Sequence, residues 1–211
     1  MIKMVAFDLD GTIGDTIPLC IEAFRQAVSP YAGHTLSDKE IVQTFGLNEM
    51  GMIKAVVNSQ CEKALDDFYT IYEKMHDRCT APYQGINDII DMLKGKGIRV
   101  ALITGKGEKA CRITLEKFGM QDTFCEIATG LESRPNKAES IRNMLKKYDL
   151  KKEEFYYVGD ALSDVTACQN AGVVCLSAAW SDAADAKGLE QMNAGHVFYT
   201  IDQLDHYFLQ L

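Results

Sequence analysis

The stretch Met4-Val-Ala-Phe-Asp-Leu-Asp-Gly-Thr12 decides how the rest of the chain is interpreted. Its first half is a short apolar run, which predicts a buried strand. Side chains two residues apart in an extended chain face the same side, so Asp8 and Asp10 are expected to point together from the carboxyl end of that strand. Gly11 permits a tight turn directly after the pair. Open parallel sheets bind ligands at this end, which makes the two aspartates candidates for chemistry.

Strands and helices are predicted to alternate along most of the chain. Further apolar runs predict strands over residues 99–104, 125–128, 155–158 and 173–177, with a short edge strand at 196–198. Helical periodicity and glycine stop signals predict helices over residues 86–96, 108–118, 138–148 and 163–170. This alternation predicts an α/β fold of three layers, with a mostly parallel sheet between two layers of helices.

Residues 16–80 break this alternation. Helices are predicted over residues 17–28, 38–45, 49–57 and 62–79, and no strand pattern lies between them. We therefore expect an inserted all-helical cap over residues 15–81 and a catalytic core made of residues 1–14 and 82–211. The hinges are expected near Gly14-Asp15 and Ala81-Pro82.

Composition narrows the class of protein. The chain has 211 residues and a formal net charge of -8, and the absence of a basic stripe argues against nucleic-acid binding. Its seven cysteines include no CxxC pair, which predicts reduced, mostly buried thiols. No signal peptide or membrane-spanning stretch is apparent, so we expect a cytoplasmic protein without membrane partners.

A second pair of carboxylates favours a functional role for Asp8 and Asp10. Asp8 and Asp10 alone fit an Asp-Gly turn as well as they fit a reaction centre. Gly159-Asp160-Ala-Leu-Ser-Asp164 follows another predicted strand and brings two more carboxylates to a strand end. Capping of the next helix by Ser163 or Asp164 would explain only one of these two aspartates. Oxygen ligands without paired histidine or cysteine suit a hard cation such as Mg²⁺.

Two further segments have the chemistry of an anion site. Thr104-Gly105 ends a predicted strand and precedes a helix, whose start is a place where backbone N–H groups bind anions. The Thr104 hydroxyl and the Gly105 N–H are therefore expected to bind phosphate. Lys106 follows without the spacing of a phosphate-binding P-loop and is expected to be solvated. Arg134-Pro-Asn-Lys137 precedes another helix and offers a positive charge for a phosphoryl group.

These segments together resemble the haloacid dehalogenase superfamily of phosphatases, over essentially the whole chain. Val5 to Thr16 is similar to the first family motif, Thr104 to the second, and Gly159-Asp160 through Asp164 to the fourth. The helical block after Gly14 lies where this family inserts a helical cap. The resemblance implies a Rossmann-like core.

The resemblance also implies roles for individual residues. Asp8 would be the nucleophile and Asp10 the acid/base. Mg²⁺ would be held by the Asp8 carboxylate, the Asp10 backbone carbonyl and Asp160, with Asp164 helping directly or through water. The expected phosphate-binding residues are Gly11, Thr12, Thr104 and Gly105.

The third motif departs from the commonest family pattern. Many relatives have Lys-Pro before this helix, whereas this chain has Arg134-Pro135. We favour Lys137 as the phosphate-neutralising cation, followed by Arg134 and then Lys106.

The expected activity is Mg²⁺-dependent hydrolysis of a small phosphomonoester through an aspartyl-phosphate, similar to phosphoglycolate phosphatases. A β-phosphoglucomutase-like mutase is the main alternative. A nucleotidase, a pyrophosphatase and a non-catalytic binding protein stay open. Asp10 argues against haloacid dehalogenases and phosphonoacetaldehyde hydrolases, which lack this second aspartate.

The partner is expected to be a small phosphorylated metabolite, selected by the cap, and the chain to be a monomer or a homodimer. The candidate cap residues that would contact it are Thr16, Asn48, Met50 and Lys54, although Met50 could equally belong to the cap core and Lys54 is more simply an exposed helix lysine. The four histidines, at positions 34, 76, 196 and 206, show no metal-ligand spacing and are expected to be structural or exposed.

Overall fold

A computed structural model describes residues 1–210. Six parallel strands form one sheet in the order β3-β2-β1-β4-β5-β6. The strands are β1 (Met4–Phe7), β2 (Arg99–Ile103), β3 (Ile127–Ala128), β4 (Phe155–Gly159), β5 (Val174–Ala178) and β6 (Val197–Phe198). The buried central strand β1 pairs with β2 and β4 on its two sides, with Phe7 opposite Leu102 and Val158. The predicted α/β fold with a parallel sheet is confirmed.

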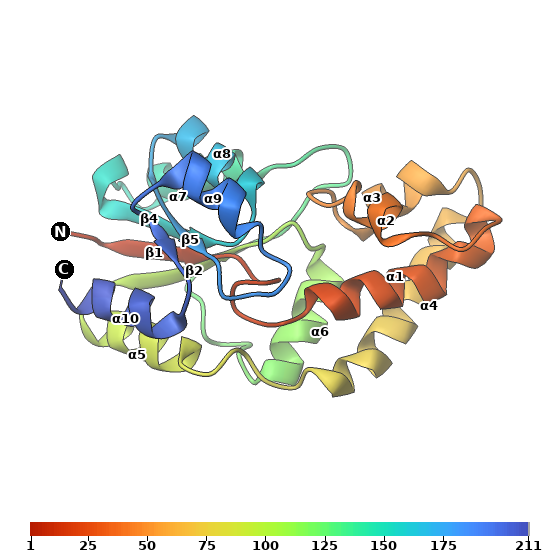
Figure 1. The fold of residues 1–211 in the computed structure, drawn as a ribbon, viewed down its shortest axis with the longest axis horizontal. Helices are drawn as coiled ribbons and strands as arrows, with labels where there is room; N and C mark the ends of the chain where they lie inside the picture. The colour runs from red at the N-terminus through yellow and green to blue at the C-terminus, as the bar shows by residue number, and fades with distance from the viewer. Residues whose placement is uncertain (211) are drawn as a thin grey trace.

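Helices cover both faces of the sheet (Figure 1). On one face, α5 (Ile86–Gly95), α6 (Glu108–Phe118) and α10 (Ile201–Leu209) pack apolar side chains into a core shared with β1 and β2. On the other face lie α7 (Lys137–Lys147), α8 (Leu162–Ala171) and α9 (Ala186–Asn193). Each helix presents one apolar stripe to the sheet, as the three-layer arrangement requires.

The cap consists of α1 (Ile17–Ala32), α2 (Asp38–Val42), α3 (Glu49–Val56) and α4 (Cys61–Met75), followed by a short 3₁₀ turn, His76–Arg78. These helices lie beyond the carboxyl ends of β1 and β2, on the side of the molecule opposite the two chain termini (Figure 1). The cap has its own apolar core, in which α1 packs on α4. Ala110 and Ile113 of α6 belong to that core as well, so the cap rests on a helix of the sheet domain.

Some elements differ from their predicted bounds. Helix α1 continues through Pro30 to Ala32, beyond the predicted end at residue 28. Helices α9 and α10 were not predicted. The pattern for α10 was nevertheless present, since Ile201, Leu204 and Phe208 form one helical face and the Thr200 hydroxyl accepts a hydrogen bond from the Gln203 N–H, 3.2 Å away.

The structure also bears on the expected burial of the cysteines and on the search for membrane-spanning segments. All seven cysteines are free, but only Cys111, Cys168 and Cys175 are buried, and Cys125 is exposed. The prediction of mostly buried thiols is therefore wrong in part. No helix within residues 1–210 combines the length and the apolar character needed to cross a membrane.

Candidate active site

The predicted site residues meet at the carboxyl ends of three neighbouring strands. Asp8 and Asp10 follow β1, Thr104 follows β2, and Asp160 follows β4. Because β1 lies between β2 and β4, the residues that follow these strands emerge side by side. They line one pocket of about 500 Å³, which also includes Lys137 and the inner side of the cap.

Three carboxylates gather at the base of this pocket. Asp8, Asp160 and Asp164 each place a carboxylate oxygen within 4.8 Å of the others. Lys137 Nζ lies 2.6 Å from Asp8 Oδ2 and 2.6 Å from Asp164 Oδ1. Burial raises the pKa of Asp8 to about 6, with Lys137 opposing the shift and Asp164 adding to it. Burial alone would lower the pKa of Lys137, but the two carboxylates outweigh it and hold that pKa above its usual value.

Asp164 combines the two functions that the sequence left as alternatives. It is the third residue of α8, and its Oδ2 accepts a hydrogen bond of 3.1 Å from the Ala161 backbone N–H. Its Oδ1 faces Lys137 and accepts a second hydrogen bond from the Tyr157 hydroxyl at 3.3 Å. The N-cap position itself belongs to Ala161, and Asp164 bonds to its backbone N–H from the third position of the helix. One aspartate therefore both stabilises the helix start and joins the carboxylate cluster.

Asp160 has the fewest partners of the three. The Thr12 hydroxyl donates a 3.1 Å hydrogen bond to Asp160 Oδ1, and within residues 1–210 no lysine or arginine forms an ion pair with this carboxylate. Burial and the neighbouring Asp8 raise its pKa well above the usual value. A hard divalent cation fits this set of buried oxygen donors, because it would balance the carboxylate that Lys137 does not reach. Gly11, at φ +75°, is required here, since a Cβ would collide with the Asp160 carboxylate.

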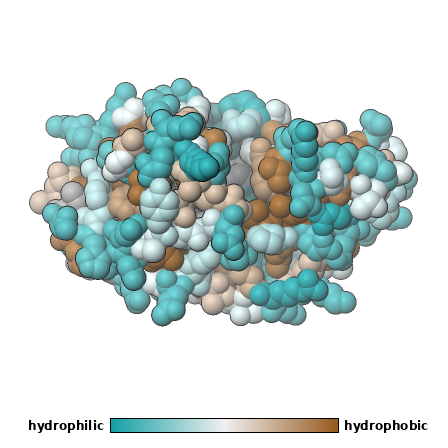
Figure 2. Space-filling model, in the orientation of Figure 1, coloured by the Kyte–Doolittle hydropathy of each residue, from teal (hydrophilic) through white to brown (hydrophobic). Residues whose placement is uncertain are grey.

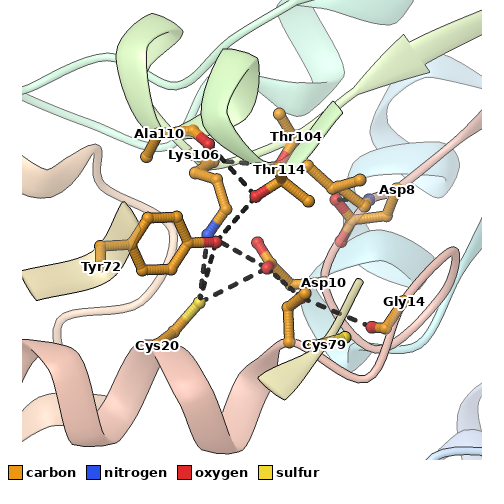
Figure 3. Close-up of polar contacts among 12 residues, drawn as sticks. Asp8, Asp10, Gly14, Cys20, Tyr72, Cys79, Thr104, Lys106, Ala110 and Thr114 are labelled. Carbon is orange, nitrogen blue, oxygen red and sulfur yellow. Dashed lines mark hydrogen bonds and ion pairs between the residues drawn. The ribbon is translucent and has the colours of Figure 1, made fainter. Parts of the chain in front are cut away.

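Asp10 lies apart from the carboxylate cluster and faces the cap (Figure 3). Its Oδ1 accepts hydrogen bonds from the Thr16 hydroxyl and, at 3.5 Å, from the Cys20 thiol, and it lies 3.1 Å from Lys106 Nζ. Burial would raise the pKa of Asp10, but Lys106 and Thr16 outweigh it and the pKa is lowered. No residue among 1–210 donates a hydrogen bond to the other carboxylate oxygen, Oδ2.

Lys106 is buried, with 5% of its side chain exposed, so the prediction that it is solvated was wrong. Its Nζ lies 3.1 Å from the Cys20 sulfur and 4.7 Å from the centre of the Tyr72 ring. The position of Lys106 in a loop predicted a solvent-exposed side chain, but α1 and α4 of the cap cover it. Burial would lower the pKa of Lys106, yet Asp10 outweighs it, so the lysine remains charged.

A chain of polar contacts continues from Lys106 into the cap-core boundary (Figure 3). The Tyr72 hydroxyl lies 2.8 Å from Thr114 Oγ1, and His76 Nε2 lies 3.0 Å from the same oxygen. His76 is therefore a buried structural histidine, as expected. Burial raises the pKa of the Cys20 thiol to about 12, so this cysteine acts as a neutral contact and not as a nucleophile.

The segment after β2 binds a carboxylate of the cap, two residues beyond the predicted phosphate ligands Thr104 and Gly105. The backbone N–H of Gly107, at the start of α6, donates to both carboxylate oxygens of Glu49 at 3.0 and 3.1 Å. This helix start is thus occupied by a cap carboxylate. The Thr104 hydroxyl oxygen accepts from the Lys106 N–H at 3.1 Å, which leaves the hydroxyl hydrogen available for a phosphate oxygen.

The other candidate residues lie farther from the carboxylates. Arg134 is exposed and pairs with Glu139 at 2.6 Å, so only Lys137 of the two third-motif cations contacts Asp8. Lys54 is exposed and pairs with Glu132, as expected of a helix lysine. Neither Met50 nor Asn48, the N-cap residue of α3, lines the pocket. The sequence reasoning missed the residues that line its cap side, among them Cys20, Phe45, Glu49 and Met52.

Helical spacing explains part of this difference. Glu49 and Met52 are three residues apart on α3 and so share the face that points into the pocket, whereas Met50 and Lys54 fall on other faces. The sequence contained this periodicity, but it did not show which face of α3 meets the core.

The sequence profile of haloacid dehalogenase-like hydrolases matches residues 5–178, and the chain belongs to this family. A protein of Caldanaerobacter subterraneus subsp. tengcongensis, provisionally named pyrophosphatase PpaX, is 30% identical over 85% of this chain and 83% of its own length. Two crystal structures are 19% identical and have TM-scores of 0.75. One, provisionally named a phosphoglycolate phosphatase, is from Lactobacillus delbrueckii subsp. bulgaricus, and 97% of each chain is covered. The other, provisionally named a β-phosphoglucomutase, is from Thermotoga maritima, and both chains are covered completely. At this identity the two structures support the fold alone.

Proposed function

We propose that this chain is a Mg²⁺-dependent phosphatase that hydrolyses a phosphomonoester through an aspartyl-phosphate on Asp8. The observation that carries the proposal is the position of Asp8, which contacts Lys137 and clusters with Asp160 and Asp164 at a pocket that Thr104 also lines. Membership of the hydrolase family supports the same reaction class.

Asp8 performs the first step as a nucleophile that attacks phosphorus and displaces the alcohol. Lys137 and the Thr104 hydroxyl balance the charge on the phosphoryl oxygens. When bound, Mg²⁺ would be held by the carboxylates of Asp8, Asp160 and Asp164 and, as the family resemblance implies, by the Asp10 carbonyl, and it would supply further positive charge to the phosphoryl group.

Asp10 provides the proton for the departing alcohol and later accepts one from the attacking water. Since Thr16, Cys20 and Lys106 all contact Oδ1, the unbonded Oδ2 is the oxygen left to carry that proton. The anionic substrate raises the pKa of a neighbouring carboxyl, which allows Asp10 to take up the proton when the pocket is filled.

The function is tested by measuring phosphate release in the presence of Mg²⁺ from two-carbon acid phosphates, sugar phosphates, nucleotides, simple alkyl esters and pyrophosphate. Release from at least one monoester supports the proposal. Isomerisation of a sugar phosphate without phosphate release would indicate the mutase, and hydrolysis of pyrophosphate alone would indicate the activity named for the PpaX relative. Absence of turnover across the panel would contradict an enzymatic role.

Magnesium is expected to stabilise the fold. A cation that neutralises the three carboxylates binds the folded chain alone and adds about 2.7 kcal/mol at 100 times its dissociation constant. This corresponds to a rise of several degrees in the thermal midpoint. Asp160→Asn should lose most of the response, while the exposed control Asp122→Asn should keep it. An equal response in all three proteins would contradict a site at Asp160.

Lys106→Met is expected to impair catalysis through Asp10. Methionine has a similar length but no charge, so Asp10 loses its buried ion-pair partner and its fixed position. We expect kcat to fall by about 10- to 100-fold with little change in KM. Lys109→Met, an exposed substitution in α6, is the matched control. An unchanged kcat in Lys106→Met would show that Lys106 does not position Asp10.

A further inference from the structure

The cap side of the pocket is a mostly apolar wall. It is formed by α1, α3, α4 and the segment between α2 and α3. Figure 2 shows hydrophobic surface gathered on the part of the cap that faces the core. The residues of this wall, which we name the apolar wall, are Ile17, Cys20, Phe24, Phe45, Leu47, Met52 and Phe68.

The apolar wall begins close to the phosphate end of the pocket. Phe45 and Leu47 flank Gly46, and a Cβ on Gly105 would lie 3.6 Å from the Gly46 Cα. Gly46 also approaches Pro135, since its own Cβ would lie 3.4 Å from that ring. The cap loop is therefore seated beside the Thr104-Gly105 segment. A group attached to a phosphate bound there would meet Phe45, which is 38% exposed.

The charged groups of the cap side already have partners. Lys106 pairs with Asp10 at 3.1 Å, and Glu49 accepts from the Gly107 N–H. The other cation that lines the pocket within residues 1–210 is Lys137, which lies at the phosphate end against Asp8. A second anionic group on the substrate would therefore find no unpaired cation on the cap side, and it would be repelled by Glu49.

On the opposite side of the pocket, the only charged residues within residues 1–210 are Lys137 and Asp160, which lie at the phosphate end. The rest of the lining from α7, α8 and their preceding loops is small or neutral, namely Pro135, Ala138, Ala161, Ser163, Thr166, Ala167 and Asn170. The volume of about 500 Å³ lies within the range of pockets that enclose whole small molecules, so there is room for a leaving group larger than two carbons.

We propose that the leaving group of the substrate is an uncharged alcohol with an apolar or aromatic body. This inference rests on the proposed phosphatase function, and it predicts a substrate different from the phosphoglycolate and pyrophosphate in the names of two relatives. Phosphoglycolate carries a carboxylate and pyrophosphate a second phosphate, and each would place negative charge against the apolar wall and Glu49. An apolar body would instead cover the exposed part of Phe45 and remove water from it.

The test compares substrates that differ only in this body, with Mg²⁺ present. Ethyl phosphate and 2-phenylethyl phosphate release primary alcohols of similar acidity, so their ratio of kcat/KM reports contacts made by the ring. We expect 2-phenylethyl phosphate to be favoured by about 10- to 100-fold over ethyl phosphate and also over phosphoglycolate and pyrophosphate. Equal or higher kcat/KM for phosphoglycolate or pyrophosphate would overturn the proposal.

A substitution at Phe45 tests whether the apolar wall causes this substrate preference. Phe45→Ala should reduce the ratio of kcat/KM for 2-phenylethyl phosphate over ethyl phosphate by several-fold. Val42→Ala is the matched control, because Val42 is 46% exposed on the same part of the cap but does not line the pocket. A ratio that stays the same in Phe45→Ala would place the leaving group elsewhere and contradict the assignment.

A binding measurement keeps the inference distinct from the proposed function. Calorimetric titration of the Mg²⁺-loaded protein compares 3-phenylpropylphosphonate, which cannot be hydrolysed, with phosphonoacetate. Tighter binding of the phenyl compound by at least tenfold is expected even if no ester is turned over. Tighter binding of phosphonoacetate would overturn the inference whatever the hydrolysis assays show.

Discussion

Asp8→Asn should abolish phosphate release, lowering kcat by about 10⁴-fold or more, while the fold stays intact. The amide cannot attack phosphorus, and no other carboxylate of the cluster can replace Asp8. Asp164 also contacts Lys137 at 2.6 Å, but it is fully buried and bonded to the start of α8, and Asp160 does not contact Lys137. The fold should tolerate the change. Burial already disfavours the charged form of Asp8, whose pKa rises to about 6, so a neutral side chain relieves repulsion from its neighbours.

The measurement is phosphate release with saturating Mg²⁺, accompanied by thermal unfolding of both proteins. Asp122→Asn makes the same chemical change at an exposed site and should retain full activity. Metal-dependent turnover by Asp8→Asn at a rate near that of the parent protein would show that Asp8 is not the nucleophile. Loss of activity together with loss of the folded state would instead indicate a structural role for this carboxylate.

The sheet and the residues at its strand ends could be predicted because their signals are local. A buried parallel strand is a continuous apolar run, as in β1 and β4, and the residue that follows it lies at the ligand-binding edge. Asp8, Asp10 and Asp160 were found in this way. Their clustering also required the strand order, which the alternation of strands and helices constrains but does not specify.

The environment of Asp10 could not be predicted, since it depends on contacts between distant segments. Lys106 and Cys20 are 86 residues apart, and Glu49 is 58 residues from Gly107. No local pattern indicates that α1 and α4 cover the loop after β2. The sequence therefore placed Lys106 in solvent, and it offered no reason to select Glu49, whose burial at 4% exposure depends on the packing of the cap against α6.

Lys137→Met should reduce both stability and activity. The Lys137 side chain is 14% exposed, and it is the only ion-pair partner within residues 1–210 of either Asp8 or Asp164. Removing it leaves two buried carboxylates beside a third, and breaking such a pair costs about 3–5 kcal/mol. We expect the thermal midpoint without metal to fall by about 10 °C. We expect kcat to fall by about 10²- to 10⁴-fold, because the phosphoryl oxygens lose their positive partner.

Magnesium separates the two effects of this substitution. The cation can replace the missing charge among the carboxylates, so the loss of stability in Lys137→Met should shrink when Mg²⁺ is added, whereas the loss of kcat should persist. Lys146→Met, on an exposed face of the same helix, should change neither quantity. If Lys137→Met unfolded at the parental temperature without metal, the ion pairs with Asp8 and Asp164 would contribute nothing to stability. If kcat also stayed unchanged, the phosphoryl charge would have to be balanced by another group, and Arg134 would be the next residue to replace.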